Sequence, residues 1–185
     1  MIEEKDLITS LQTGADKETA FRELVSQYKQ RLYWQIRNMV LNHDDADDVL
    51  QNTFIKIFRN IDSFKGESKL HTWMYRIAAN ESITFLNNKA KRNNVSIENV
   101  KDNAIKNLEE DVYFEGDKIQ MVFQKAIATL PERQRLIFTM KYFGDHTFEE
   151  LSQILDTTVG GLKSSYHIAV KKITEYIKSD DETFF

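Results

Sequence analysis

Apolar residues recur every three or four positions in two long parts of the chain, from about residue 15 to 92 and from about residue 118 to 178. This spacing places them along one side of an α-helix and does not suit a strand, in which the faces alternate at every second residue. The 185 residues also include only one Pro and six Gly, too few for the tight hairpins of a sheet protein. The sequence therefore predicts an all-α fold with two small helical bundles.

The segment between the two periodic parts, residues 93–117, is rich in Asn, Asp and Glu and has only scattered apolar residues. This composition is typical of a linker. We therefore expect one domain over residues 1–92, an acidic linker over 93–117 and a second domain over 118–185. The net charge of −4 hides an uneven distribution, because residues 56–92 carry eight Lys and Arg against three Asp and Glu.

The composition excludes several classes of protein. There is no Cys, which rules out disulfides, thiol nucleophiles and thiolate zinc sites and suits a reducing compartment. The first residues, MIEEKDLITS, lack the apolar run of a signal peptide. No segment has the roughly 20 apolar residues that a membrane span requires. We expect a cytoplasmic protein that is not itself in a membrane.

The second periodic part contains the pattern of a helix-turn-helix. Thr147 and Glu150 have the spacing of a capping box, which starts a helix, and Thr158 follows a short polar break as the expected cap of the next helix. That next helix is expected to bury Val159, Leu162, Tyr166, Ala169, Ile173 and Ile177. Its other side carries Lys163, Ser164, His167 and Lys171. A basic outer face after a short helix and turn suits a major-groove reader, and a helical hairpin with a solvated Lys face is the alternative.

Gly160 and Gly161 lie in the first turn of that helix, where each costs up to about 1 kcal/mol relative to Ala. A close approach of backbone N–H groups to a DNA phosphate would explain them. His146 and His167 are expected at the surface or facing DNA, and not as metal ligands.

The first periodic part contains a predicted loop at 64–69, where Gly66 permits a turn, and a helix follows it. A protein that holds unpaired DNA needs flat rings or pockets for the bases and cations for the backbone. Trp73 is expected in the core, because an aromatic residue in a small bundle is usually buried. Arg76, Asn80 and the loop are therefore the better candidates for contact with DNA.

Two segments resemble a known family. Region 2 of the extracytoplasmic-function (ECF, group IV) class of sigma-70 RNA polymerase sigma factors is similar to DDADDVLQNTFIKIFRNIDSFKGESKLHTWMYRIAANESI. Region 4 of the same class is similar to LPERQRLIFTMKYFGDHTFEELSQILDTTVGGLKSSYHIAVKKI. The two segments stand in the order expected of the family, with the expected linker between them. The resemblance implies a transcription initiation factor, not an enzyme, that binds core RNA polymerase, directs it to specific promoters and assists promoter opening without a cofactor.

The resemblance also implies the residues that contact DNA. For the −10 element, where a base would be flipped into a pocket formed by the loop, they are Phe64, Lys65, Ser68, Lys69, His71, Arg76 and Asn80. For the −35 element, they are Thr158, Gly160, Lys163, Ser164, Ser165, His167 and Lys171. The acidic linker would thread toward the polymerase active centre and the RNA exit path. Ser165 and Ile168 stand where the family often has Arg, and Leu70 where Phe is frequent, so no promoter sequence is carried over.

The acidic stretch near residue 45 has three possible explanations: a helix start, a docking surface or a metal site. In a helix over 44–61, Asp44 and Asp45 lie at the N-terminus, where the helix dipole favours anions. The face expected to be buried consists of Ala46, Val49, Leu50, Phe54, Ile57, Phe58 and Ile61. The resemblance assigns docking on the clamp helices of the largest polymerase subunit to Asp45, Asp48, Gln51 and Asn52. A His-Asp metal phosphohydrolase would need further ligands on other helices, so we expect no metal site and no catalytic residue.

Two other functions remain open at this point. The first is a free helix-turn-helix DNA-binding regulator. A net charge of −4 argues against it, because nonspecific affinity for DNA depends on neutralisation of phosphates by basic side chains. An anti-sigma-like or scaffold protein would bind partners and no DNA. The resemblance implies core RNA polymerase, promoter DNA and an anti-sigma factor as partners.

Overall fold

The computed structural model describes residues 4–14, 16–94, 118–144 and 146–181. In these ranges the chain forms helices and no strand, which confirms the all-α prediction. The acidic linker lies outside the described residues, apart from residues 93 and 94. None of the described helices is long and apolar enough to cross a lipid bilayer. The α-helices are α1 (Glu4–Thr13), α2 (Lys17–Val40), α3 (His43–Asn60), α4 (Leu70–Arg92), α6 (Lys118–Thr129), α7 (Glu132–Tyr142), α8 (Phe148–Leu155) and α9 (Val159–Asp181), and a 3-10 turn, η1, spans Ile61–Ser63.

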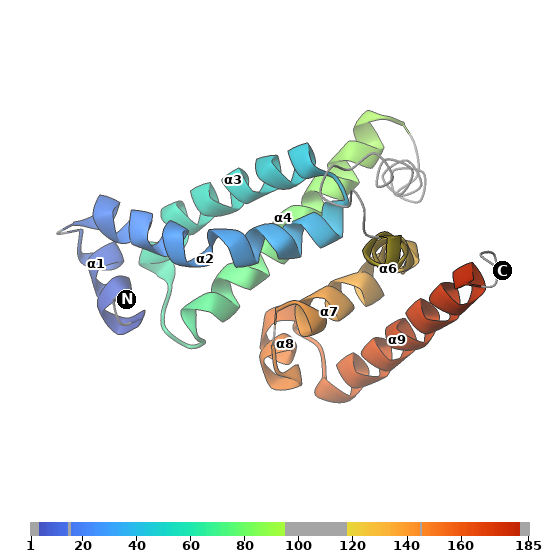
Figure 1. Ribbon diagram of the computed structural model, residues 1–185. Helices are drawn as coiled ribbons and strands as arrows, with labels where there is room; N and C mark the ends of the chain where they lie inside the picture. The colour runs from blue at the N-terminus through green and yellow to red at the C-terminus, as the bar shows by residue number, and fades with distance from the viewer. Residues whose placement is uncertain (1–3, 15, 95–117, 145, 182–185) are drawn as a thin grey trace.

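The first group of helices, α1–α4, is built around α2, α3 and α4 (Figure 1). Each of the three helices turns an apolar side inward. The buried residues include Leu24, Leu32 and Ile36 of α2, Val49, Leu50 and Ile57 of α3, and Met74, Ala78 and Leu86 of α4. Full burial of one Leu or Ile side chain contributes roughly 1.5 to 3 kcal/mol, so this core fixes the exposed faces of α3 and α4.

Helix α3 begins where α2 is stopped by a left-handed residue. Leu41 has φ 64°, and its N–H donates to the carbonyl of Arg37 at 2.9 Å. The Asn42 side chain then caps α3 by accepting a hydrogen bond from the backbone N–H of Asp45 at 3.0 Å. The aspartates at the start of α3 therefore lie in its first turn, as predicted.

The buried face of α3 agrees with the sequence at six of its seven expected positions. The prediction was wrong for Phe58, which is 41% exposed. Its ring lies at the edge of the group, 4.9 Å from the ring of Phe21, with Lys17 Nζ 5.1 Å from its centroid. Helical spacing places Phe58 on the apolar side of α3, but among the described residues its ring stays partly exposed at the edge of the group.

The second group of helices, α6–α9, contains the predicted helix-turn-helix. Helix α8 begins in a capping box, in which Thr147 Oγ1 accepts from the Glu150 N–H at 3.1 Å and Glu150 Oε2 accepts from the Thr147 N–H at 3.0 Å. It ends at Asp156, which has φ 48°. Thr158 Oγ1 then accepts from the Gly161 N–H at 3.3 Å in the first turn of α9. Both predicted helix starts are thus confirmed.

The two groups pack against each other, with α7 against α2 and α8 against α4 (Figure 1). We call this packing the closed arrangement. Leu136, Ile137 and Met140 of α7 and Leu151 and Ile154 of α8 belong to the same continuous core as α2, α3 and α4. The sequence predicts two bundles, but nothing in its local pattern predicts this contact between them.

Candidate functional site

The loop at 64–69 is held firmly at its first residue. Phe64 is only 7% exposed, and its ring lies 5.3 Å from the ring of Trp73, which packs against the core as expected. Gln12 Nε2 donates to the carbonyls of Ile61 and Phe64 at 3.0 and 2.8 Å. Gly66 has φ +72°, in the left-handed region that favours glycine. In the closed arrangement, Phe64 therefore supports the loop from inside and does not present its ring to a base.

The polar residues of the loop differ in exposure. Lys65 is exposed and Ser68 is half-buried. The side chain of Lys69 is 66% exposed, and its Nζ lies 3.0 Å from Glu150 Oε1 of the second group. The predicted −10 surface is therefore partly in contact with the helix-turn-helix.

Arg76 and Asn80 are exposed and lie one turn apart on the outer side of α4. Arg76 Nε donates to the carbonyl of Ile154 in α8 at 3.0 Å. Both side chains line a hollow between α4 and the second group, which Arg133 and Asp156 also line. The structure thus places these two predicted DNA contacts together, at the edge of the closed arrangement.

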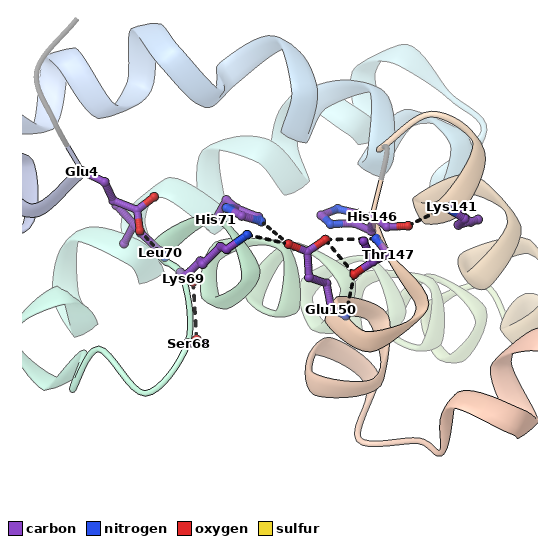
Figure 2. A network of polar contacts seen from close by, with 9 residues as sticks. All are labelled: Glu4, Ser68, Lys69, Leu70, His71, Lys141, His146, Thr147 and Glu150. Carbon is purple, nitrogen blue, oxygen red and sulfur yellow. Dashed lines mark hydrogen bonds and ion pairs between the residues drawn. The ribbon is translucent and has the colours of Figure 1, made fainter.

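Glu150 connects the two groups (Figure 2). Its Oε2 accepts from the backbone N–H and the hydroxyl of Thr147 at 3.0 and 3.2 Å, and its Oε1 faces Lys69 Nζ and, at 3.6 Å, His71 Nε2. The hydrogen bond from the Thr147 N–H is the main cause that lowers the pKa of Glu150 from 4.5 to about 2; Lys69 lowers it further, and burial opposes both. At neutral pH the side chain is therefore an anion.

We expect Glu150→Gln to reduce the free energy of unfolding by about 1 kcal/mol at pH 7, the usual size of a capping interaction. Because the folded pKa is depressed, the ionised carboxylate stabilises the protein fully above about pH 4.5, and this contribution is lost as the pH falls toward 2. Urea denaturation at several pH values from 7 to 3 should show that the difference in free energy of unfolding between the unaltered protein and Glu150→Gln becomes smaller. The exposed neighbour Glu149→Gln is the control, and a gap that does not change with pH would contradict the assignment.

His146 is buried, and the prediction that it lies at the surface or faces DNA was wrong. It is 2% exposed, with its ring centroid 4.4 Å from that of Tyr75 and 5.9 Å from that of His71. A Cβ on Gly144 would lie 2.6 Å from the Met140 carbonyl oxygen and 2.7 Å from His146 Cδ2, so this turn requires glycine. The burial follows from the packing of the two groups, which local sequence does not specify.

Helix α9 presents the predicted outer face. Its exposed polar residues include Lys163, Ser164, His167 and Lys171, whereas Ser165 is half-buried. Thr158 and Gly160 are exposed at its start. A Cβ on Gly160 would meet nothing within 4 Å, so packing inside the described chain does not account for this glycine. A Cβ on Gly161 would lie 3.2 Å from Thr158 Oγ1, which the cap explains.

Arg133 is a residue of this region that the sequence interpretation missed. Its Nη2 donates to Thr157 Oγ1 at 2.7 Å, which links the start of α7 to the turn before α9. The contact thus helps to hold the start of α9 in place relative to α7. In the sequence, the polar turn before α9 indicated that its side chains could form hydrogen bonds, but nothing at position 133 identified Arg133 as the donor.

The outer face of α3 exposes Asp48, Gln51 and Asn52, as predicted. Asp45 differs, because its carboxylate forms an ion pair with Lys89 of α4 and its side chain is 18% exposed. Ile55, which the interpretation missed, is 41% exposed one turn beyond Gln51 and Asn52. An apolar side chain flanked by acidic and amide groups is a common composition for a protein-docking surface.

Comparison with protein families gives two matches. Residues 24–92 match the family model described as Sigma-70 region 2. Residues 120–173 match the model described as Sigma-70, region 4. The two matches contain the residues predicted to contact the −10 and −35 elements, and the outer face of α3.

Individual relatives agree with these matches. The ECF RNA polymerase sigma-E factor of Escherichia coli (strain K12) is 32% identical over 167 residues, which is 85% of each chain. The RNA polymerase sigma-H factor of Pseudomonas aeruginosa is 30% identical over 170 residues, 88% of this chain and 87% of that one.

Two solved structures share the fold. CnrH in complex with the cytosolic domain of CnrY has a TM-score of 0.70 at 18% identity, with 96% of this chain and 98% of that chain covered. The sigma factor RpoE in complex with the anti-sigma factor NepR from Bartonella quintana has a TM-score of 0.67 at 20% identity, with 86% and 98% covered.

Proposed function

The chain belongs to the ECF class of sigma-70 RNA polymerase sigma factors, which direct transcription initiation and are not enzymes, and from this membership we propose which of its surfaces bind polymerase and promoter DNA. The outer face of α3 docks on the clamp helices of the largest polymerase subunit. The loop at 64–69 and α4 hold the melted −10 element, and α9 contacts the −35 element. The protein acts in the cytoplasm, where the polymerase is.

The observation that carries this proposal is the distribution of exposed polar groups. Arg76 and Asn80 lie on the first group, whereas Lys163 and His167 lie on the second. Two DNA elements that are separated along a promoter require two separate surfaces, each with its own cations and hydrogen-bonding groups. A free regulator that used only the helix-turn-helix would have no use for the surface around Arg76.

The −35 contact is expected to be partly electrostatic. Lys163 is exposed in the second turn of α9, with its Nζ 5.8 Å from the centroid of the Phe148 ring. A lysine placed in this way can reach a phosphate at the edge of the major groove, whereas Ser164 and His167 can hydrogen-bond to base edges. We assign Lys163 to a phosphate.

We expect Lys163→Ala to weaken binding to the −35 element similarly for all sequences, and to reduce the slope of log affinity against log salt by about 1. The reason is that one neutralised phosphate fewer releases one condensed counterion fewer. Holoenzyme binding to an upstream promoter fragment, measured between low and moderate salt, tests this. Lys178→Ala, an exposed lysine near the end of α9, should leave the slope unchanged.

The closed arrangement must open before promoter DNA binds. Lys69, His71 and Arg76 all face α8 or its cap, through Glu150 and the Ile154 carbonyl. These groups cannot hold those partners and a DNA strand at once. We propose that polymerase binding separates the two groups and frees the −10 surface.

We also propose an anti-sigma factor as a partner. The two solved structures that share this fold hold the cytosolic domain of CnrY and the anti-sigma factor NepR as partners. In this chain Trp34 of α2 and Phe123, Tyr142 and Phe143 of the second group line a groove that runs between the groups. A partner helix that fills this groove would contact both groups and stabilise the closed arrangement.

The experiment that tests the function mixes the purified protein with bacterial core RNA polymerase and measures runoff transcription from a pool of promoter fragments. Selective transcripts that depend on the protein are the expected result. If the protein bound duplex DNA without core and directed no initiation, the free regulator would replace the sigma assignment.

A further inference from the structure

Two histidines and a glutamate from the two helical groups converge at one point (Figure 2). His71 is the second residue of α4, His146 lies in the turn between α7 and α8, and Glu150 lies in the first turn of α8. One ligand atom from each side chain lies within 4.8 Å of the other two. The pair formed by His71 Nε2 and Glu150 Oε1 is separated by 3.6 Å.

We propose that His71, His146 and Glu150 bind a divalent transition metal, best suited to Zn²⁺, that links the two helical groups. Zinc accepts three protein ligands of this kind and a water in a tetrahedral arrangement. Ligand atoms then lie about 3.3 Å apart, since each bond is about 2.0 to 2.1 Å long. The His71 and Glu150 atoms already approach this separation, and since all three atoms lie within 4.8 Å of one another, no pair must close by more than about 1.5 Å.

The chemistry of the three ligands selects the class of metal. Two imidazoles and one carboxylate suit Zn²⁺, Ni²⁺, Co²⁺ and Cu²⁺, whereas Ca²⁺ and Mg²⁺ prefer oxygen ligands. The expectation of no metal site rested on the need for further ligands on other helices, and the histidines were better explained otherwise. The fold brings residues 71 and 146 together, with their rings stacked at a centroid distance of 5.9 Å.

Neighbouring groups already orient two of the ligands. Thr147 donates its N–H and hydroxyl to Glu150 Oε2, which leaves Oε1 directed toward His71. The His146 ring is fixed against Tyr75, and its backbone carbonyl accepts from Lys141 Nζ at 2.9 Å. Outer contacts of this kind hold ligands in position and increase metal affinity.

Lys69 is the cation that competes for this site. Its Nζ lies 3.0 Å from Glu150 Oε1, the same oxygen that would bind the metal. The Lys69 side chain is 66% exposed, so it can turn into solvent when a metal arrives. We therefore expect Lys69→Gln to bind metal more tightly than the unaltered protein.

The site exists only in the closed arrangement, because α4 supplies one ligand and the second group supplies two. A metal that binds only the closed arrangement shifts the population toward it. This binding does not depend on the proposed function. The consequence for transcription does depend on it: bound zinc should inhibit promoter opening by keeping His71 and Arg76 against α8.

The first test titrates the metal-free full-length protein with zinc sulfate by calorimetry and uses Co²⁺ as a spectroscopic probe. One metal per chain, and the intense visible bands of tetrahedral Co²⁺, are expected. His71→Gln, His146→Ala and Glu150→Gln should each weaken binding at least about 10-fold, and His167→Ala, an exposed histidine on α9, should bind as before. His71→Gln keeps the test valid if His146→Ala fails to fold, since the His71 side chain is only partly buried.

No binding, or binding that survives both His71→Gln and Glu150→Gln, would overturn the proposal. A second measurement uses the absence of cysteine in the chain, which lets dyes be attached at Asn60→Cys on α3 and Lys178→Cys on α9. Zinc should narrow the distance distribution between the dyes, and Glu150→Gln should abolish that change. An unchanged distribution despite tight binding would overturn the link between the groups.

Runoff transcription separates this inference from the proposed function. Zinc should reduce transcripts made with the unaltered protein and have less effect on those made with Glu150→Gln. If zinc binds and narrows the distance but no transcript appears even without zinc, the sigma assignment fails and the metal site stands. If transcription proceeds and zinc does not bind, the metal site fails alone.

Discussion

We expect Arg76→Ala to slow promoter opening by about 10- to 100-fold, because the guanidinium is assigned to the melted −10 strand and a hydrogen bond to a charged group contributes about 1.5 to 3 kcal/mol. Arg76 is exposed on α4 beside Asn80, and Asn80→Ala should act in the same direction with a smaller effect. The measurement is the rate at which holoenzyme opens a promoter that carries a fluorescent base in the −10 element. Affinity for core polymerase should not fall.

The contact between Arg76 and the Ile154 carbonyl makes this test decisive. If Arg76 served only to hold the closed arrangement, its removal would favour separation of the two helical groups. The rate of promoter opening would then rise. Arg59→Ala removes an exposed arginine from α3 and should leave the rate unchanged. A rate for Arg76→Ala that is equal to or above that of the unaltered protein would contradict its assignment to DNA.

The double substitution Asp48→Lys and Gln51→Lys should weaken binding to core polymerase by about 100-fold, within the 2 to 5 kcal/mol that disruption of a buried charge pair across an interface costs. Both side chains are exposed on the outer face of α3, and Ile55 extends that surface by one turn. Fluorescence anisotropy of the labelled protein, titrated with core, gives the dissociation constant. Asp45→Lys is less informative, because it would also break the ion pair with Lys89.

A matched control changes the net charge by the same amount at another place. Glu18→Lys with Thr19→Lys alters two exposed residues in the first turn of α2. This protein should bind core with unchanged affinity if docking involves α3. Equal losses for both double variants would show a general charge effect and refute the docking face.

The sequence predicted those features that depend on neighbours along the chain. The capping box of Thr147 and Glu150, the turn at Gly66 and the exposed face of α9 all follow from spacings of a few residues. Helix caps and helix faces are local because hydrogen bonds and side-chain contacts within a helix join residues three or four apart.

The contacts between the two groups could not be predicted in the same way. Lys69 meets Glu150, Arg76 meets the Ile154 carbonyl and His146 is buried against Tyr75, and each pair is separated by more than 70 positions. Each residue taken alone resembles an ordinary surface residue. Their roles became visible only when α8 was placed against α4, which depends on the shape of the whole apolar surface.

The core shared by the two groups stabilises the closed arrangement, and this free energy lowers the affinity for every partner that binds only the open form. Ile137 and Met140 of α7 lie in the core shared with α2, and α7 packs against α2. If the closed form is a hundredfold more populated than the open one, a partner that requires the open form binds about 100-fold more weakly than its contacts alone would allow. A smaller side chain at Ile137 could therefore tighten polymerase binding without touching the polymerase, and tuning this internal contact would set how readily the factor competes for a limited supply of core.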